Sequence, residues 1–216
     1  MAERILRVAI ADDHPIVRDG LHRIVSACHD LEVVAEIASG FEVVERLESV
    51  AADVLLLDIS MPGPGFLELL EEIRKAKPRP AVLVLSAYQE EAFAVRVRQA
   101  GATGFLNKQR SSEDLADAIR AVGAGDCYFG GRAIPRAACE REVTRIDSVT
   151  GHLSPREFEV FLLLGAGLRV TDIASRLELS PKTVSTHRAR ILEKTGFQSN
   201  AEIVRYAAST GLVEGT

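Results

Sequence analysis

The first part of the chain alternates short apolar runs with segments in which apolar residues recur at helical spacing. The apolar runs are 6–11, 54–57, 81–85 and 104–107, and residues 31–37 alternate apolar and other side chains, as an outer strand does. Apolar runs of this length that alternate with helices are typical of strands in a buried parallel sheet. We therefore predict an α/β domain over residues 1–125, with a five-stranded parallel sheet in the flavodoxin-like doubly wound arrangement.

Polar residues follow four of these runs, at the point where each predicted strand ends. They are Asp12, Asp13, Asp58, Ser86 and Lys108. In a doubly wound sheet, ligands bind in the crevice outside the carboxyl ends of the strands. We expect three carboxylates, one hydroxyl and one ammonium group to meet there. Such a set suits a divalent cation and a phosphoryl group.

Residues 151–216 carry no strand pattern and contain repeated helix-start signals. Ser154, Ser180 and Ser199 each stand where the N-cap of a helix is expected. A three-residue turn at 178–180 separates the second predicted helix from the third. We predict an all-α domain of four short helices in a helix-turn-helix layout, joined to the first domain by a linker at 126–150.

Charge is distributed unevenly along the chain. The net charge of −5 divides into −6 for residues 1–125, zero for 126–150 and +1 for 151–216. The acidic first domain is therefore a poor candidate for nucleic-acid binding. Within the last domain, residues 182–194 carry four basic side chains against one glutamate. Positive charge is thus concentrated on one predicted helix.

That helix is predicted to bury Val184 and Ile191 and to expose its opposite face. Small hydroxyl side chains can contact base edges in the major groove, and basic side chains can contact phosphates. We expect Ser185, Thr186 and Arg190 to contact bases. The complete candidate DNA-binding set is Lys182, Thr183, Ser185, Thr186, Arg188, Arg190 and Lys194. The alternative is an ordinary solvated helix face.

The cysteines and the apolar segments bear on the compartment. Cys28, Cys127 and Cys139 form no Cys-x-x-Cys pair, so we expect reduced thiols that pack as small apolar residues, without a disulfide frame or zinc site. No apolar stretch reaches the roughly 18 residues of a membrane span. The N-terminus lacks a signal-peptide pattern. We expect a cytoplasmic protein that does not associate with a membrane.

Six short motifs, in this order and spacing, carry a resemblance to a known family. They are 11–15 (Ala-Asp-Asp-His-Pro), 57–63 (Leu-Asp-Ile-Ser-Met-Pro-Gly), 85–87 (Leu-Ser-Ala), 107–108 (Asn-Lys), 153–157 (Leu-Ser-Pro-Arg-Glu) and 180–184 (Ser-Pro-Lys-Thr-Val). Residues 1–125 resemble a response-regulator receiver domain, and residues 151–216 resemble a LuxR-type helix-turn-helix. Together they resemble the NarL/FixJ family of two-component response regulators.

The resemblance implies roles for the polar residues at the strand ends. Asp58 would be the phosphoacceptor. Magnesium would be bound directly by Asp13 and Asp58, mainly through water by Asp12, and by the backbone carbonyl of Ser60. Lys108 would pair with a phosphate oxygen. Ser86 would donate its hydroxyl to the phosphoryl group, and this movement together with Phe105 would form the switch.

The resemblance also implies partners. A sensor histidine kinase would phosphorylate the chain, which would then dimerise through its last helix and bind an inverted-repeat operator in double-stranded DNA. RNA polymerase is a further candidate partner. Without phosphorylation, the receiver would mask the helix at 182–194. The chain would act as a regulator and not as an enzyme.

Several alternatives accompany these assignments. A lone aspartate at a strand end often caps a turn, Ser86 could be an ordinary loop residue, and Phe105 could simply pack in the core. His14 is expected to cap its helix locally. An aspartyl-phosphate phosphatase would need a second aspartate at the position of Ser60. A constitutive DNA-binding protein would use the receiver for dimerisation alone.

The loop that follows Asp58 departs from the family pattern. Family members usually read Met-Pro-Gly-x-Asp-Gly-Leu after the phosphorylated strand, whereas this chain has Gly65 and Phe66 in place of the usual Asp and Gly. We expect a loop of different shape beside Asp58, with consequences for the lifetime of the phosphoryl group and the fit to the kinase.

Overall fold

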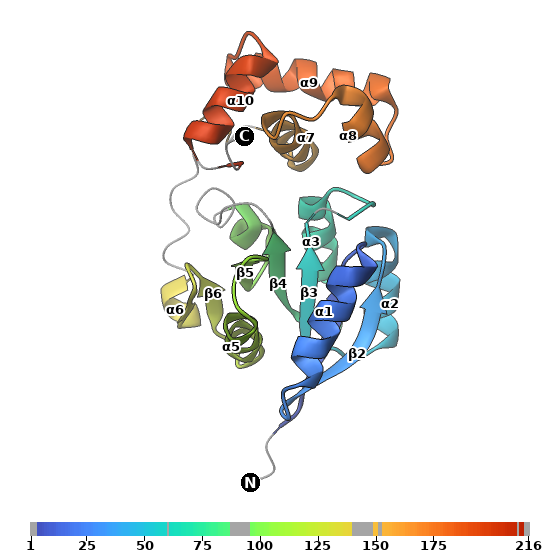
Figure 1. Ribbon diagram of the computed structural model, residues 1–216, viewed down its shortest axis with the longest axis vertical. Coiled ribbons are helices and arrows are strands. Elements are labelled where there is room, and N and C mark those ends of the chain that lie inside the picture. Colours follow the sequence, from blue (N-terminus) through green and yellow to red (C-terminus); the bar gives the residue numbers. More distant parts are fainter. Residues whose placement is uncertain are drawn as a thin grey trace.

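The structure, a computed structural model, describes residues 4–59, 61–86, 96–139, 149–150, 153–210 and 212–213. Its first domain alternates strands and helices around one sheet (Figure 1). The strands are β1 (Leu6–Ala11), β2 (Leu31–Ile37), β3 (Val54–Asp58), β4 (Ala81–Ser86), β5 (Gly104–Asn107), β6 (Cys127–Phe129) and β7 (Arg132–Ile134). The helices are α1 (Pro15–Ser26), α2 (Val43–Ser49), α3 (Phe66–Lys75), α5 (Ser112–Gly123) and α6 (Arg136–Cys139), with a 3-10 turn, η1, at Gly40–Glu42.

The sheet has the order β2-β1-β3-β4-β5-β6-β7. The first six strands in this order pair in parallel, and β7 pairs antiparallel with β6. The doubly wound parallel arrangement is confirmed, but the predicted number of five strands is wrong. The two additional strands come from residues 127–134, where Gly130 and Gly131 have φ values of 63° and 69° and close a tight hairpin.

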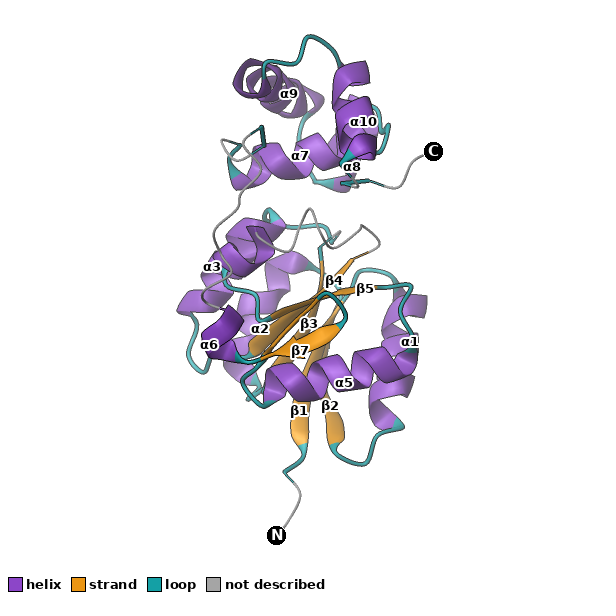
Figure 2. Cartoon of the chain, turned by 90° about the vertical axis from the view of Figure 1, so that its left-hand side faces the viewer, coloured by secondary structure: helices purple, strands orange, loops and turns teal. Residues whose placement is uncertain are grey.

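Helices cover both faces of this sheet, as Figure 2 shows. On one face, α1 and α5 pack on Val8 and Ile10 of β1. On the other face, α2 and α3 pack on Ala9 and Ala11 of the same strand. Because alternate residues of a strand point to opposite faces, both sets are buried. The double burial explains why these strands are continuous apolar runs in the sequence.

The second domain consists of α7 (Pro155–Gly165), α8 (Val170–Arg176), α9 (Pro181–Thr195) and α10 (Asn200–Ser209). The hydroxyls of Ser154, Ser180 and Ser199 accept backbone N–H groups in the first turns of α7, α9 and α10, as predicted. Fully buried Phe158 and Phe161 form the centre of the domain. The four-helix layout with a tight turn between α8 and α9 is confirmed.

The two domains meet through α3 and α7. In both views α7 lies on the side of the second domain that faces the receiver, and α9 lies on the far side (Figures 1 and 2). No helix within the described ranges is long and apolar enough to cross a membrane.

Candidate functional site

Two adjacent parallel strands place the acidic residues. Asp12 directly follows β1 and Asp58 is the last residue of β3, and the two strands pair so that Ala11 lies opposite Leu57. Asp12 is fully buried and Asp58 is 3% exposed. One ligand atom from each of Asp12, Asp13, His14 and Asp58 lies within 4.8 Å of the others. The carboxylate oxygens of this cluster are the ligand type that magnesium requires.

Lys108 supplies the positive charge beside this cluster. Its Nζ lies 2.7 Å from Oδ2 of Asp12 and 3.0 Å from Oδ2 of Asp58. Burial opposes the charge of this ammonium group, but the two carboxylates outweigh it and raise the pKa of Lys108. Lys108 is therefore held in its charged form, with its ammonium group directed at the predicted phosphoacceptor.

The ends of β4 and β5 complete the site. Ser86 is fully buried at the last position of β4, and its carbonyl accepts the N–H of Lys108 at 2.7 Å. This hydrogen bond places Ser86 and Lys108 at the carboxyl ends of the strands, next to Asp58. Phe105 is fully buried in the core beneath them. The switch roles of Ser86 and Phe105 stay predictions, and Ser60 lies outside the described residues.

His14 does not behave as predicted. It occupies the N-cap position of α1, but its side chain makes no capping hydrogen bond. Its Nδ1 instead lies 2.8 Å from Oδ1 of Asp13, and its side chain is 58% exposed. Oδ1 of Asp12 accepts the backbone N–H of His14 at 2.9 Å, which forms an Asx-turn just before the helix. The imidazole is thus a member of the acidic cluster.

Helix α9 carries the candidate DNA-binding residues. Val184 and Ile191 are fully buried, as predicted, which turns the opposite face outward. Lys182, Ser185, Thr186, Arg190 and Lys194 are exposed, and Thr183 and Arg188 are half-buried. The expected masking of this helix by the receiver is therefore wrong for this structure, because the domain contact uses α7.

Two of the basic candidates on α9 have partners inside the domain. Nζ of Lys194 lies 2.6 Å from Oε2 of Glu157, a carboxylate that also accepts the backbone N–H of Ser154. Nε of Arg188 donates to Oδ1 of Asn200 at 2.6 Å. These contacts hold α9 to α7 and α10. The sequence does not predict these two contacts, since each joins residues that lie on different helices.

Comparison with known proteins places this arrangement in a family. Residues 8–120 match the response regulator receiver domain, and residues 151–207 match the bacterial regulatory proteins of the luxR family. Response regulator GacA of Pseudomonas aeruginosa is 33% identical over 211 residues, which cover 97% of this chain and 99% of GacA. Response regulator UvrY of Escherichia coli is 32% identical over 209 residues, which cover 96% of each chain. The chain belongs to the NarL/FixJ family of two-component response regulators.

Solved structures of RcsB from Salmonella typhimurium resemble this response regulator over nearly its whole length. One RcsB structure has a TM-score of 0.71 at 29% identity, with 96% of this chain and 99% of RcsB covered. Another, of RcsB bound to the rprA promoter in the presence of the phosphomimetic BeF3−, has a TM-score of 0.64 at 28% identity, with 94% and 98% covered.

The unusual loop of this response regulator forms one of the contacts between its domains. A Cβ atom at Gly65 would lie 3.2 Å from Oε2 of Glu159 and 3.6 Å from Cδ of Arg156, both on α7. The buried carboxylate of Glu159 accepts the backbone N–H of Phe66, the first residue of α3. The aspartate that relatives usually carry at position 65 would bring a second carboxylate against Glu159.

The same contact has a charged side and an apolar side. Nη1 of Arg156 lies 2.6 Å from Oε2 of Glu159. Burial nevertheless raises the pKa of Glu159 to about 7, with Arg156 and the Phe66 N–H opposing the rise. Ile59 and Phe66 of the receiver line an apolar interface with Leu162 of α7. Ile59 directly follows Asp58, so the contact begins one residue from the predicted phosphoacceptor. We refer to it as the α3–α7 contact.

Arg96, in the helical segment 96–100, makes a second contact with the DNA-binding domain. Its guanidinium stacks over the ring of Phe158, 3.9 Å from the ring centre. It also donates to the carbonyls of Thr150 and Leu153. The receiver thus holds α7 and the residues just before it from two sides.

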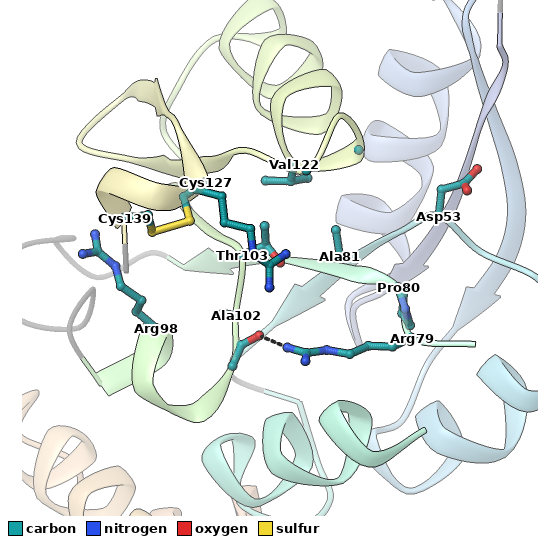
Figure 3. Close-up of a pocket in the computed structure, with 14 residues that line it drawn as sticks. Asp53, Arg79, Pro80, Ala81, Arg98, Ala102, Thr103, Val122, Cys127 and Cys139 are labelled. Carbon is teal, nitrogen blue, oxygen red and sulfur yellow. Dashed lines mark hydrogen bonds between the residues drawn. A yellow bond between two sulfur atoms is a disulfide. The ribbon is translucent and has the colours of Figure 1, made fainter. Parts of the chain in front are cut away.

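The cysteines overturn one expectation. Cys127 of β6 and Cys139 of α6 form a disulfide, with their Cα atoms 6.3 Å apart, and Cys28 is free. The expectation of three reduced thiols is wrong because β6 and α6, which were not predicted as neighbours, bring two distant cysteines together. The bond fastens α6 to β6, the strand next to the edge strand β7 (Figure 3).

Proposed function

We propose that this response regulator is a phosphorylation-controlled transcription factor whose acceptor is Asp58. The observation that carries the proposal is the position of the buried Asp58 carboxylate, which lies 3.0 Å from the Lys108 ammonium within a cluster of three carboxylates. A sensor histidine kinase is the proposed donor. The chain accepts the phosphoryl group and transmits the change, so we do not assign it an enzymatic turnover of its own.

In the transfer step, a carboxylate oxygen of Asp58 forms a bond to phosphorus, and the bond between phosphorus and the kinase imidazole nitrogen breaks. The imidazole keeps the electron pair. Asp12, Asp13 and Asp58 fit a magnesium ion, which would neutralise charge between the carboxylates and the incoming phosphoryl group. Lys108 lies within reach of a phosphate oxygen and can pair with it. The Ser86 hydroxyl is proposed to bind the new phosphoryl group, with Phe105 moving in the same switch.

The α3–α7 contact gives the added charge a route to the DNA-binding domain. Phosphorylation replaces the single negative charge of the Asp58 carboxylate with a phosphoryl group of about −1.5 to −2, at the residue that precedes Ile59 at the interface. We propose that rearrangement of the segment from Asp58 to Phe66 weakens the hydrogen bond to Glu159 and frees α7 from the receiver. The protein would then shift between two existing states, docked and released.

Released domains are proposed to dimerise on DNA. One helix-turn-helix buries little DNA surface, so paired half-sites are needed for tight and specific binding. Ala201 and Ala208 are exposed on α10 and Val204 is half-buried there, which leaves small side chains for pairing. The face of α9 with Ser185, Thr186 and Arg190 is proposed to read the operator, an inverted repeat. Cytoplasmic location and recruitment of RNA polymerase belong to the same proposal.

The proposal is tested by selecting genomic DNA fragments with the purified protein, with and without magnesium and beryllofluoride. We expect one inverted-repeat motif to be enriched only when the phosphoryl mimic is present, and Asp58→Asn to abolish that response. Equal enrichment in both conditions would show a constitutive DNA-binding protein, consistent with the exposed face of α9. An Asp58→Asn variant that responds like the parent would contradict the assignment of the acceptor.

A further inference from the structure

His14 adds a nitrogen atom to the acidic cluster, and the proposed function does not use it. One ligand atom from each of Asp12, Asp13, His14 and Asp58 lies within 4.8 Å of the others. The three carboxylates supply oxygen, whereas the imidazole supplies nitrogen. Oxygen ligands suit Mg²⁺, and imidazole suits first-row transition ions. The position of His14 therefore bears on which cation this response regulator binds.

Nδ1 of His14 lies close to two carboxylate oxygens of the cluster. It is 2.8 Å from Oδ1 of Asp13 and 3.4 Å from Oδ1 of Asp12. Ligand atoms that lie about 2.1 Å from an octahedral ion are separated from their neighbours in the shell by about 3 Å. The spacing of Nδ1 from the two oxygens is therefore that of adjacent ligands of one cation.

The contact between His14 and Asp13 lacks the geometry of a hydrogen bond. Oδ1 of Asp13 is buried and, within the described part of the chain, finds no hydrogen-bond donor, although Nδ1 of His14 is only 2.8 Å away. By contrast, Nδ1 of His22 on the same helix forms a hydrogen bond with Oε1 of Glu36 at 2.6 Å. A buried carboxylate oxygen without a donor costs free energy, and a cation shared with His14 would remove that cost.

The backbone holds His14 in this position. Its N–H donates to Oδ1 of Asp12 at 2.9 Å, and its carbonyl accepts the N–H of Arg18 at 3.0 Å in the first turn of α1. Pro15 follows at the first position of the helix and fixes the direction in which the helix starts. The imidazole makes no capping hydrogen bond, so the helix does not occupy its Nδ1. The backbone of the residue is thus tied on both sides, while the ring stays beside Asp13.

We propose that Nδ1 of His14 is a ligand of the divalent cation held by Asp13 and Asp58, and that it makes the site select Mn²⁺ over Mg²⁺. This inference rests on the proposed function, because it concerns the cation site of that function. A neutral imidazole that binds an ion through Nδ1 keeps its proton on Nε2. Mn²⁺ accepts oxygen and nitrogen ligands together, whereas Mg²⁺ gains little from nitrogen. His14 would therefore strengthen the binding of Mn²⁺ in particular.

The test measures binding of Mn²⁺ and Mg²⁺ to the full-length, untagged protein at constant pH. The affinity for Mn²⁺ comes from the electron paramagnetic resonance signal of the free ion, and the affinity for Mg²⁺ comes from its competition with Mn²⁺. Pulsed measurements on bound Mn²⁺ detect coupling to a nitrogen nucleus, which reports an imidazole ligand directly. The variant is His14→Ala. The matched control is His22→Ala, because His22 lies on the same helix and also pairs with a carboxylate but is not part of the cluster.

We expect the parent and His22→Ala to prefer Mn²⁺ and to show the nitrogen coupling. In His14→Ala the coupling should be lost and Mn²⁺ should bind about tenfold more weakly, since replacing residues that only orient a metal ligand already costs about 10–100-fold in affinity. The affinity for Mg²⁺ should change far less. The inference is overturned, with the proposed function intact, if the parent shows no nitrogen coupling, if the coupling survives in His14→Ala, or if both ions lose affinity equally. If neither ion binds the parent, the cation site of the proposed function is wrong as well.

Discussion

Glu159 is expected to make the docking of the two domains depend on pH. The pKa of this carboxyl is about 7 in the docked structure, because burial disfavours its charge, against an ordinary value of 4.5. Release of α7 from the receiver would expose the carboxyl and restore the ordinary value. The docked state therefore holds the proton more tightly, and docking weakens as the pH rises between these two values.

The size of the effect follows from the two pKa values. Between pH 6 and pH 8 the equilibrium constant for docking should fall about tenfold, which corresponds to about 1.4 kcal/mol. Arg156 and Glu68 also face this carboxyl, from α7 and α3 respectively. Burial also lowers the pKa of the His187 imidazole, which lies near Arg156 and Glu68. Release that restores its ordinary pKa would give a slope of opposite sign to that of Glu159, because the docked state binds the His187 proton less tightly.

Docking can be followed by single-molecule energy transfer between dyes on the two domains. Non-natural residues at the exposed positions of Glu48 and Gln198 would carry the dyes and leave the disulfide intact. The control is Glu159→Gln, which has the same shape and can still accept the Phe66 N–H but does not titrate. We expect it to remove most of the pH dependence. If Glu159→Gln keeps the parent's slope, or if the parent shows none, the reasoning about Glu159 is wrong.

Three further perturbations follow from described contacts. Gly65→Asp should weaken docking, because it places a carboxylate against Glu159. Energy transfer between the same two dyes should then report a larger fraction of released protein. Gly65→Asn, which has a similar shape but no charge, should have a smaller effect. Lys194→Ala should lower the free energy of unfolding by about 1–3 kcal/mol, since it leaves the buried Glu157 without its ammonium partner. Urea unfolding measures this loss. The control Lys182→Ala removes a lysine at an exposed position and should change the free energy of unfolding little. Reduction of the Cys127–Cys139 disulfide should lower the free energy of unfolding by about 3 kcal/mol, from the loop entropy of its 12-residue separation. Urea unfolding with and without dithiothreitol tests this value. If a thiol-trapping assay finds both cysteines already reduced in the parent, the pairing is wrong.

The parts of the fold that could be predicted depend on local pattern. Strands β3 and β4 are buried on both faces, so each is a continuous apolar run, whereas the outer strand β2 alternates apolar and polar residues. The general rule that ligands bind at the carboxyl ends of parallel strands is enough to predict from the sequence that Asp12, Asp58 and Lys108 lie together. The serine caps of α7, α9 and α10 were predicted for the same reason, because a cap involves residues three positions apart.

The parts that could not be predicted depend on contacts between distant segments. Strands β6 and β7 have three residues each, too few to show a period, and the glycines of their hairpin also suit a linker. The pairing of Cys127 with Cys139 requires those strands. The contact of Gly65 with Glu159 joins residues of different domains, and no periodicity in either segment indicates it. The departure from the family pattern at Gly65 and Phe66 indicates that this loop is unusual, but it does not indicate that the loop contacts Glu159 of α7.

The α3–α7 contact also bears on how such proteins can diversify by exchange of domains. Gly65 and Glu159 are complementary, since the small residue on the receiver leaves room for the carboxylate on α7. A receiver taken from a relative with the usual aspartate at this position would repel this DNA-binding domain. Conversely, this DNA-binding domain would dock poorly on any receiver that carries that aspartate. An exchange of domains would therefore keep docking intact only if the residues at positions 65 and 159 changed together.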